Sequence, residues 1–368
     1  MKEISTSLAI IGAGASGGAL ALFASRLGIS TVLIDKENFP RYKPCGCGVT
    51  DRALQLIDSS LPPERIHSAE FNDGNLKFKT SSPSPISVGT RESLDDHICR
   101  EAISYGALFL QNENVLSVIN SHEKVQISTV NYAINCKLLA VATGVKGNLP
   151  EELGFDKVKS IPALEEELAG NIETAFRFDF SAVKGGYGWS FPKSCGTSSI
   201  GVLTTLKGVN LSDALIKYKE SLGLVGAKSV RINGHPIPVA PVKIFNVGRS
   251  IVIGDAAGLV DPLTFEGLYY SYYSAKLAAE SFKQHLDNPE AACKQYGMKV
   301  KKEIIPELKL ALILSKLVYR NPRFRKYLFS HYGQHLTNAI TDVFSGKRKF
   351  RDELLKPSNY FQLLLKRL

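Results

Sequence analysis

The chain of 368 residues carries a net charge of +10, and its content of 44% hydrophobic and 22% charged residues excludes a disordered or fibrous protein. No uninterrupted apolar run approaches the ~20 residues that a membrane-spanning helix needs. Six cysteines are too few for a disulfide framework in so long a chain, so we expect reduced thiols in a cytoplasmic protein.

The N-terminal segment follows the pattern of a dinucleotide-binding βαβ unit. The apolar run Leu8–Ile11 predicts a buried parallel strand, which leads into Gly12-Ala13-Gly14-Ala15-Ser16-Gly17. A helix of small residues through Arg26 and a second strand at Thr31–Ile34 follow. The glycines of this segment would disrupt the helical core of a secretory signal, so we expect none here.

The residue types in this unit suit the binding of a dinucleotide. Gly12 permits a tight turn, Gly14 lets backbone N–H groups approach a pyrophosphate, and Gly17 lets the helix pack closely on the strand. The positive end of the helix dipole favours phosphate. Asp35, directly after the second strand, is placed to accept hydrogen bonds from a ribose hydroxyl. The unit alone does not distinguish NAD from FAD.

The middle of the chain predicts an antiparallel sheet. Residues 175–180 alternate with period two, as expected for a half-buried strand, and further strands are predicted around 187–192, 197–205 and 228–233. We expect this sheet to form a substrate domain that lies over the cofactor and walls an apolar cavity.

A second strand-and-turn segment selects FAD as the cofactor. The apolar run Ser250–Ile253 is followed by Gly254-Asp255-Ala256-Ala257-Gly258. In many FAD enzymes such a segment brings its Asp to the ribityl or pyrophosphate part of the flavin. Because this segment lies far from the βαβ unit in the sequence, we expect a discontinuous cofactor domain.

The positive charge is concentrated in the C-terminal fifth of the chain. Residues 294–368 contain 17 Lys/Arg and 5 Asp/Glu, whereas the preceding residues contain 28 Lys/Arg and 30 Asp/Glu. The pattern here is helical, and residues 354–367 look amphipathic and basic. Such a region suits an anionic surface, either nucleic acid or acidic phospholipid, but solvated helix faces that pack on the protein's own core fit it equally well.

Four further stretches resemble the geranylgeranyl reductase family, within the p-hydroxybenzoate-hydroxylase-like flavoproteins. Residues 38–48 are similar to its Pro-Arg-x-Lys-x-Cys-Gly-Gly-Gly loop beside the isoalloxazine, and residues 90–95 to a segment whose Arg contacts FAD. Residues 142–144 match a turn near the pyrophosphate. Residues 187–192, which include the single Trp of the chain, resemble the aromatic-x-Trp-x-Phe-Pro motif of the isoprenoid tunnel. Aromatic residues of an ordinary sheet core are the alternative interpretation.

The resemblance implies a set of site residues. The residues implied for FAD are Gly12, Gly14, Ala15, Ser16, Gly17, Asp35, Lys36, Arg41, Cys45, Gly46, Arg91, Val115, Ala142, Thr143, Gly144, Gly254, Asp255 and Gly267. The substrate residues are Tyr187, Trp189, Phe191 and Pro192. Cys45 is the candidate for the group nearest the reacting alkene, although a small thiol that only shapes the loop would fit as well. We expect no metal, because Cys45-Gly-Cys47 lacks a second CxxC or a His pair.

Three positions depart from the family pattern. Cys47 and Phe265 each replace a usual glycine, and Leu203 stands at the last glycine of the tunnel motif. Phe265 would lie near the pyrimidine edge of the flavin. These changes leave the substrate and the flavin environment open.

The fold that we expect is α/β, with a Rossmann-like three-layer FAD domain, an inserted antiparallel-sheet substrate domain and a helical C-terminal region. We assign 1–60, 88–155 and 245–288 to the first, 61–87 and 156–244 to the second, and 289–368 to the third.

The expected activity is FAD-dependent saturation of carbon–carbon double bonds in a prenyl chain on a lipid, quinone or diphosphate. A flavin monooxygenase or halogenase acting on a small aromatic molecule and a non-catalytic prenyl-binding protein are the alternatives. A halogenase would be expected to carry a WxWxIP motif, and the chain has a single Trp. No second GxGxxG is present, so electrons would come from visiting NAD(P)H or a protein donor. We expect no nucleic acid partner and a peripheral association with an anionic membrane.

Overall fold

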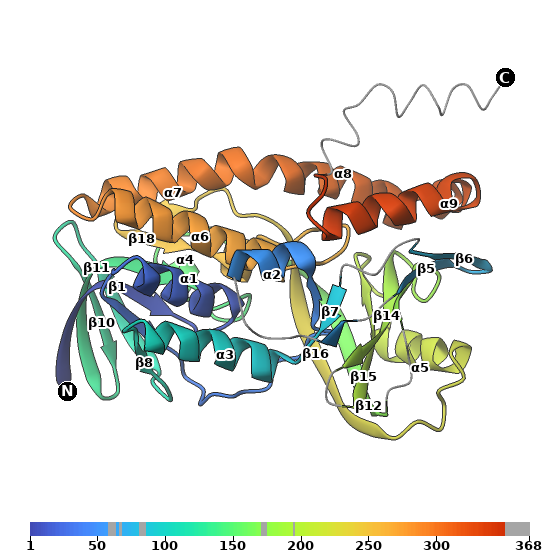
Figure 1. Ribbon diagram of the computed structural model, residues 1–368, viewed down its shortest axis with the longest axis horizontal. Coiled ribbons are helices and arrows are strands. Elements are labelled where there is room, and N and C mark those ends of the chain that lie inside the picture. The colour runs from blue at the N-terminus through green and yellow to red at the C-terminus, as the bar shows by residue number, and fades with distance from the viewer. Residues whose placement is uncertain (58–63, 66–67, 81–85, 171–174, 194–195, 350–368) are drawn as a thin grey trace.

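A computed structural model describes residues 1–349 except for 58–63, 66–67, 81–85, 171–174 and 194–195. The basic stretch predicted to be amphipathic at 354–367 therefore lies outside the described residues. The helices of the C-terminal part of the chain run along one side of the molecule and cover two separate sheets (Figure 1). The expected α/β fold with an FAD-type Rossmann domain and a helical C-terminal region is confirmed.

The first sheet has a mainly parallel centre in the order β17-β18-β11-β1-β2-β8, with β10 and β9 added beside β11. Its strands are β1 (Lys2–Ile11), β2 (Thr31–Ile34), β8 (Leu108–Leu110), β9 (Val115–Asn120), β10 (Val125–Thr129), β11 (Tyr132–Val141), β17 (Asn246–Val247) and β18 (Ser250–Val252). Strand β1 lies between β11 and β2 and is parallel to both. Leu139 of β11 pairs in register with Ser250 of β18, so the late segment joins the N-terminal unit in one sheet.

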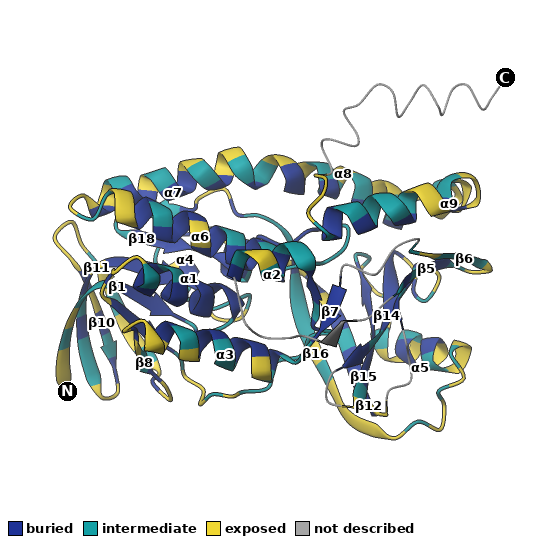
Figure 2. Ribbon diagram, viewed as in Figure 1, coloured by how far each residue is buried: buried dark blue, intermediate teal, exposed yellow. Residues whose placement is uncertain are grey.

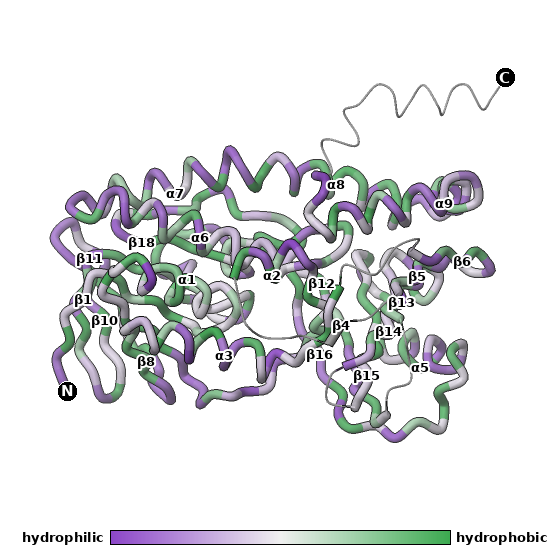
Figure 3. Tube along the Cα trace, viewed as in Figure 1, coloured by the Kyte–Doolittle hydropathy of each residue, from purple (hydrophilic) through white to green (hydrophobic). Residues whose placement is uncertain are grey.

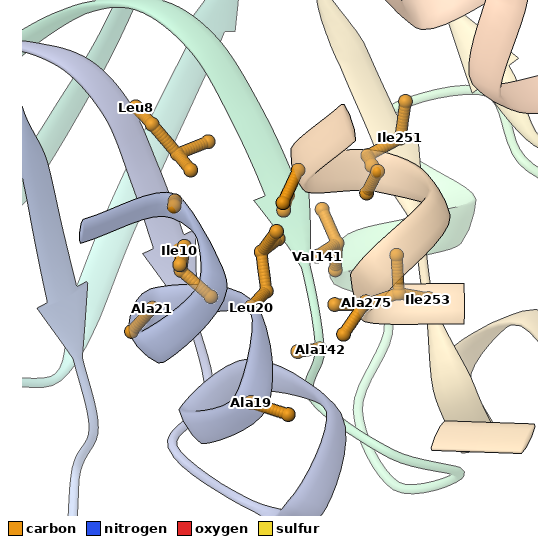
Figure 4. Packing of buried hydrophobic residues seen from close by; sticks show 14 of the residues in the cluster. Leu8, Ile10, Ala19, Leu20, Ala21, Val141, Ala142, Ile251, Ile253 and Ala275 are labelled. Atoms are coloured by element: carbon orange, nitrogen blue, oxygen red, sulfur yellow. The ribbon is translucent and has the colours of Figure 1, made fainter. Parts of the chain in front are cut away.

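Helices pack on this sheet and bury its apolar strands. They are α1 (Ala15–Arg26), α3 (Arg91–Ser104), α6 (Leu268–Gln284) and α7 (Pro289–Glu303). The short helix α2 (Asp51–Ile57) contacts α6, and the short helix α4 (Leu149–Glu152) follows β11 in the chain. Leu8, Ile10, Leu20 and Val141 are fully buried. Figure 4 shows side chains of β1, β11, β18, α1 and α6 meeting in this core. Burial of each such large side chain contributes roughly 1.5–3 kcal/mol.

The second sheet has seven strands in the order β16-β12-β15-β14-β13-β5-β6. They are β5 (Ala69–Asp73), β6 (Leu76–Lys79), β12 (Lys159–Ala169), β13 (Phe176–Asp179), β14 (Gly186–Lys193), β15 (Thr197–Thr204) and β16 (Ser229–Ala240). All neighbours are antiparallel except β5 and β13, which are parallel, and this one pairing departs from the predicted antiparallel sheet. Helix α5 (Leu211–Ser221) packs on one face of this sheet. The strands β3 (Gly48–Thr50), β4 (Glu64–Arg65) and β7 (Ile86–Val88) form a separate small sheet.

The helices α8 (Ile305–Arg320) and α9 (Pro322–Phe344) close the side of the second sheet that α5 leaves open. Phe180 contacts Tyr319 of α8 and Phe329 of α9, with ring centroids 6.2 and 5.3 Å apart. The guanidinium of Arg325 donates two hydrogen bonds to Asp73, at 3.0 and 3.1 Å. Among the described residues, none of the helices combines the length and the hydropathy that a membrane-spanning segment requires.

Candidate functional site

The turn after β1 depends on two glycines. Gly12 has a φ of +100°, and a Cβ there would lie 2.5 Å from the Ala142 carbonyl oxygen. A Cβ at Gly17 would lie 1.8 Å from the Gly12 carbonyl oxygen. Any side chain at either position would therefore separate α1 from β1 or β11. The close approach explains why the sequence places glycines here.

The N-terminus of α1 is arranged to receive an anion. Gly14 precedes the helix, and no side chain of the described residues caps this end. Its first backbone N–H groups are therefore available to a ligand, and the helix dipole adds a positive partial charge. Two guanidinium groups lie close by: a Cβ at Gly14 would be 3.4 Å from Arg41 and 3.8 Å from Arg91.

Asp95 holds these two arginines in place. Arg91 donates to both carboxylate oxygens of Asp95, at 2.9 and 2.8 Å, and Arg41 lies 3.4 Å from the same carboxylate. The carboxylate is fully buried. One negative charge between two positive ones leaves an excess of positive charge beside the helix N-terminus, which fits a pyrophosphate.

Asp35 contacts the backbone of the glycine-rich turn. One of its oxygens accepts a hydrogen bond from the Ala13 N–H at 2.6 Å, and the other accepts one from the Glu37 N–H at 2.9 Å. The sequence predicted a contact with a ribose and did not anticipate this contact with the turn. A carboxylate offers about four lone-pair directions, so Asp35 can bind the turn and a ribose hydroxyl together.

The turn after β18 meets the first turn directly. Gly254 has a φ of +57°, and a Cβ there would lie 2.5 Å from the Ser16 hydroxyl oxygen. The following residues form a short 3-10 helix, Gly254–Ala257. Asp255 faces Lys43, with 3.8 Å between the carboxylate and the ammonium group. Segments that are distant in the sequence thus form one continuous wall of the site.

The loop at 43–47 lies against the aromatic strand β14. A Cβ at Gly46 would lie 2.7 Å from the Phe191 ring and 3.4 Å from Trp189 Nε1, so only glycine permits this contact. The Cys45 sulfur accepts a hydrogen bond from the Cys47 N–H at 3.3 Å. The hydrogen bond with the Cys47 thiol lowers the pKa of Cys45 to about 6, although burial opposes this change.

Alternate residues of β14 face the same side of the second sheet. Tyr187, Trp189 and Phe191 all line a cavity, as their parity predicts, whereas Pro192 does not. The Trp189 ring lies over Gly201 of β15, where a Cβ would be 2.1 Å from the ring. Phe191 packs edge-on against Phe178, with ring centroids 5.0 Å apart.

A buried polar network lies behind Trp189. Its indole N–H donates to the Ser199 hydroxyl at 2.9 Å, and this hydroxyl donates to Glu165 at 2.6 Å. Lys193 donates to the same carboxylate at 3.2 Å. Glu165 lines the cavity and is only 4% exposed. No role for Glu165 was predicted from the sequence, although three consecutive glutamates within a predicted sheet region indicate buried partners.

A cavity of about 850 Å³ joins the glycine-rich turn to the aromatic strand. This volume is at the upper end of the range for cofactor and ligand sites. All of the predicted site residues line it except Gly17, Gly254 and Pro192, and the first two of these support the wall from behind. The cavity lining also includes residues that were not predicted from the sequence, among them Tyr42, Glu165, Phe176, Asn233 and His235.

The cavity fits the elongated FAD molecule at its cradle end. The Thr143 hydroxyl is buried there and has no hydrogen-bond partner among the described residues, so a polar group of a ligand would satisfy it. The glycines, the helix N-terminus and the two arginines provide the small backbone and positive charge that a pyrophosphate needs.

Two of the three departures at family glycines adopt left-handed backbone. Cys47 has a φ of +48° and Phe265 a φ of +58°. This region costs an L-residue with a side chain roughly 1–2 kcal/mol. The backbone shape that glycine would favour is thus kept, and each side chain enters the cavity wall. Phe265 contacts Tyr187 and Tyr319, both at 6.0 Å between ring centroids.

The fold is shared with solved flavoproteins. A geranylgeranyl bacteriochlorophyll reductase-like protein from Thermoplasma acidophilum superposes with a TM-score of 0.77 at 18% identity, over 93% of this chain and 92% of that one. A triple mutant of a flavin-dependent brominase superposes with a TM-score of 0.76 at 20% identity, over 93% of this chain and 94% of its own.

Sequence comparison identifies the family. Residues 5–190 match the FAD binding domain family. An uncharacterized protein of Methanosarcina barkeri is 30% identical over 85% of this chain and 83% of its own length. The geranylgeranyl diphosphate reductase of Rhodobacter capsulatus is 26% identical over 74% of this chain and 73% of its own. The chain therefore belongs to the FAD binding domain family and is an FAD-dependent oxidoreductase that is similar in sequence to a geranylgeranyl diphosphate reductase.

Proposed function

We propose that this protein reduces carbon–carbon double bonds in a prenyl chain carried by a lipid, a quinone or a diphosphate. The observation that supports this proposal is the continuous cavity from the dinucleotide cradle to the aromatic strand β14. Its far end offers apolar rings, among them Phe178, Tyr187 and Trp189, to an extended hydrocarbon. The similar Rhodobacter capsulatus reductase is named for geranylgeranyl diphosphate, which bears such a chain.

The cradle end would hold the cofactor through polar and backbone groups. We assign the pyrophosphate to the N-terminus of α1 with Arg41 and Arg91, and a ribose to Asp35. The remaining proposed contacts come from backbone or small side chains around the same wall: Gly12, Gly14, Ala15, Ser16, Lys36, Gly46, Val115, Ala142, Thr143, Gly144, Asp255 and Gly267. Gly17 and Gly254 would act by allowing the turns to approach each other.

Bound FAD in its reduced state supplies a hydride. An isolated alkene is a poor hydride acceptor, so the residues around it would have to align the chain and exclude water. We assign Cys45 as the group nearest the alkene, because it lines the cavity where the loop meets Trp189 and Phe191. Electrons would come from NAD(P)H or from a donor protein.

We also propose that α8 brings the protein to an anionic membrane. Its outer face exposes Ile313 and Leu317, which are 57% and 42% exposed, between Lys309, Lys316 and Arg320. Figure 2 shows this exposed face of α8 opposite its buried one, and Figure 3 shows hydrophobic and hydrophilic segments alternating along the helix. Apolar side chains within a basic rim suit the interface of an acidic bilayer.

The position of α8 links this face to the cavity. Its buried residue Tyr319 packs against Phe265, which lines the cavity. A prenyl chain anchored in a bilayer would therefore lie close to the aromatic end of the site. This proximity supports a substrate carried by a membrane lipid or quinone.

The membrane proposal is tested by liposome sedimentation. The double variant Lys309→Glu/Lys316→Glu should lose binding to acidic vesicles, because each basic residue near such a surface contributes about 1 kcal/mol. The matched variant Lys207→Glu/Lys217→Glu makes the same charge change at exposed residues before and on α5 and should bind normally. Equal loss in both variants, or equal binding to neutral vesicles, would contradict a specific face on α8.

The reaction itself is tested with purified enzyme whose flavin has been reduced anaerobically. A geranylgeranyl-bearing lipid should gain two hydrogen atoms for each bond reduced, measured by mass spectrometry, as the flavin absorbance returns to that of the oxidised form. Failure with every prenyl carrier, together with hydroxylation or halogenation of a small aromatic compound in air, would move the function to the monooxygenase class.

A further inference from the structure

The loop beside the aromatic strand contains two cysteines that both line the cavity, Cys45 and Cys47. Cys47 takes the place of a usual family glycine and has a φ of +48°. Glycine adopts this backbone at no steric cost, whereas a residue with a side chain adopts it only with strain. The chain therefore carries a second thiol at a position where the backbone favours its absence, which points to a role for that thiol.

The side chain of Cys45 points toward residue 47. Its sulfur accepts the hydrogen bond from the Cys47 N–H at 3.3 Å, and the two thiols also contact each other. Cys47 is 1% exposed, whereas Cys45 is only partly buried. A molecule that enters the cavity thus reaches Cys45 first and has Cys47 directly behind it.

The two thiols differ in protonation. The hydrogen bond from Cys47 lowers the pKa of Cys45, and the Arg91 guanidinium adds to this effect, while burial and Glu165 oppose it. The same hydrogen bond and burial raise the pKa of Cys47. Cys45 is therefore the nucleophile of the pair, and Cys47 keeps its proton.

Other described cysteines lack this environment. Cys99, Cys136 and Cys293 are buried at 2% exposure or less, none of them lines the cavity, and burial raises the pKa of each. Oxidation of cysteine selects thiolates that a reagent can reach, and a neighbouring thiol then allows a disulfide to form. Among the described cysteines, only Cys45 is an accessible thiolate with a neighbouring thiol, which is that of Cys47.

We propose that Cys45 and Cys47 form a reversible redox pair that hydrogen peroxide converts to a disulfide within the loop. The Cys45 thiol ionises, and its thiolate attacks one peroxide oxygen. The O–O bond breaks, and the hydroxide that leaves takes up the proton released by Cys45 to become water. The Cys47 sulfur then displaces hydroxide from the Cys45 sulfenic acid, forming the S–S bond and releasing the Cys47 proton into a second water. The two thiols lose two electrons, and the peroxide is reduced by the same two.

Disulfide formation would change the wall of the cavity. Gly46 lies between the two cysteines, and the loop already contacts Phe191 and Trp189 so closely that no Cβ fits at this residue. We expect a new bond across Gly46 to shift this closely packed loop relative to β14. We expect the oxidised protein to stop turning over and to recover when the bond is reduced. This inference concerns the thiols and holds whatever substrate the enzyme reduces.

The experiment treats the purified, FAD-loaded protein with hydrogen peroxide and then blocks free thiols with iodoacetamide. The wild type should lose two hydrogen atoms in mass and two titratable thiols, with the link mapped to Cys45 and Cys47. Dithiothreitol should restore both thiols and the activity. Peptides that contain Cys136 and Cys293 provide internal controls and should remain fully reduced.

The matched variant is Cys47→Gly, which restores the residue that the backbone favours and is expected to fold. Without the second thiol, Cys45 should react more slowly, because the hydrogen bond that lowers its pKa most is lost. It should still gain one and then two oxygen atoms, and dithiothreitol should not reverse the second step. The proposal is overturned if the wild type itself accumulates oxygen on Cys45, if its disulfide maps to another cysteine, or if Cys47→Gly recovers as fully as the wild type.

Discussion

Replacement of Asp35 by Ala should weaken FAD binding and should also lower the free energy of unfolding of the apoprotein. The two effects have different causes. In the apoprotein the substitution removes the acceptor for the Ala13 N–H, which lies 2.6 Å from the carboxylate. Ala13 is fully buried, so its N–H would lose its partner away from water. An unsatisfied buried donor costs about 1–3 kcal/mol, which we expect as a lower free energy of unfolding.

The effect on FAD adds to this. A charge-assisted hydrogen bond from a ribose hydroxyl contributes roughly 1.5–3 kcal/mol, so the Kd for FAD should rise at least about tenfold. Asp35→Asn keeps an oxygen for the Ala13 N–H and removes the charge, so it should preserve apoprotein stability better than Asp35→Ala. Denaturant unfolding of the apoprotein and fluorescence titration with FAD measure the two quantities separately. An unchanged Kd in Asp35→Ala would refute the assignment of the ribose to this carboxylate.

Two further changes test the cavity wall and the buried acid near it. Trp189→Ala should slow the reduction of long prenyl substrates at least about tenfold while FAD stays bound; truncating a buried Trp costs about 3–5 kcal/mol, so a thermal melt must show that the variant is folded. Wild-type kcat/KM in a folded variant would contradict the tunnel assignment. Burial raises the pKa of Asp261 from its ordinary 3.8 to about 6. The folded protein therefore binds this proton more tightly than the unfolded chain does, and the resulting stabilisation is complete below pH 3.8. As pH rises through 6 it is lost, and the free energy of unfolding should fall by about 3 kcal/mol. Asp261→Asn should remove this part of the pH dependence of denaturant unfolding, and an unchanged profile would show that another group causes it.

The cradle could be predicted because its determinants are local. Gly12, Gly17 and Asp35 occupy fixed places relative to one strand and one helix. The later turn at Gly254 also follows a buried strand directly. The face of β14 followed from the alternation of side chains along a strand. The motif residues themselves are close together in sequence, although the close contacts that Gly12 and Gly254 permit, with Ala142 and Ser16, join distant segments.

Other features depend on partners that are distant in sequence, and these were missed. The parallel pairing of β5 with β13 joins strands that no local pattern connects. Glu165 is buried because Ser199 and Lys193 reach it from β15 and β14. The contact of Asp35 with the Ala13 N–H likewise depends on the exact bend of the turn, which a motif specifies only approximately. Tertiary packing decides these contacts, and a single sequence does not reveal it.

The pairing of strands in the first sheet also determines when this protein can fold. Strand β1 is complete early in synthesis, yet its neighbour β11 follows more than a hundred residues later, and β18 pairs with β11 only after the whole second sheet has been made. Contacts between such distant segments form slowly because a long loop must close first. A nascent chain that ends before Ser250 would leave the Leu139–Val141 edge of β11 without its partner. We therefore expect such truncated chains to aggregate, and a ribosome-bound chain to acquire resistance to protease only after β18 has emerged.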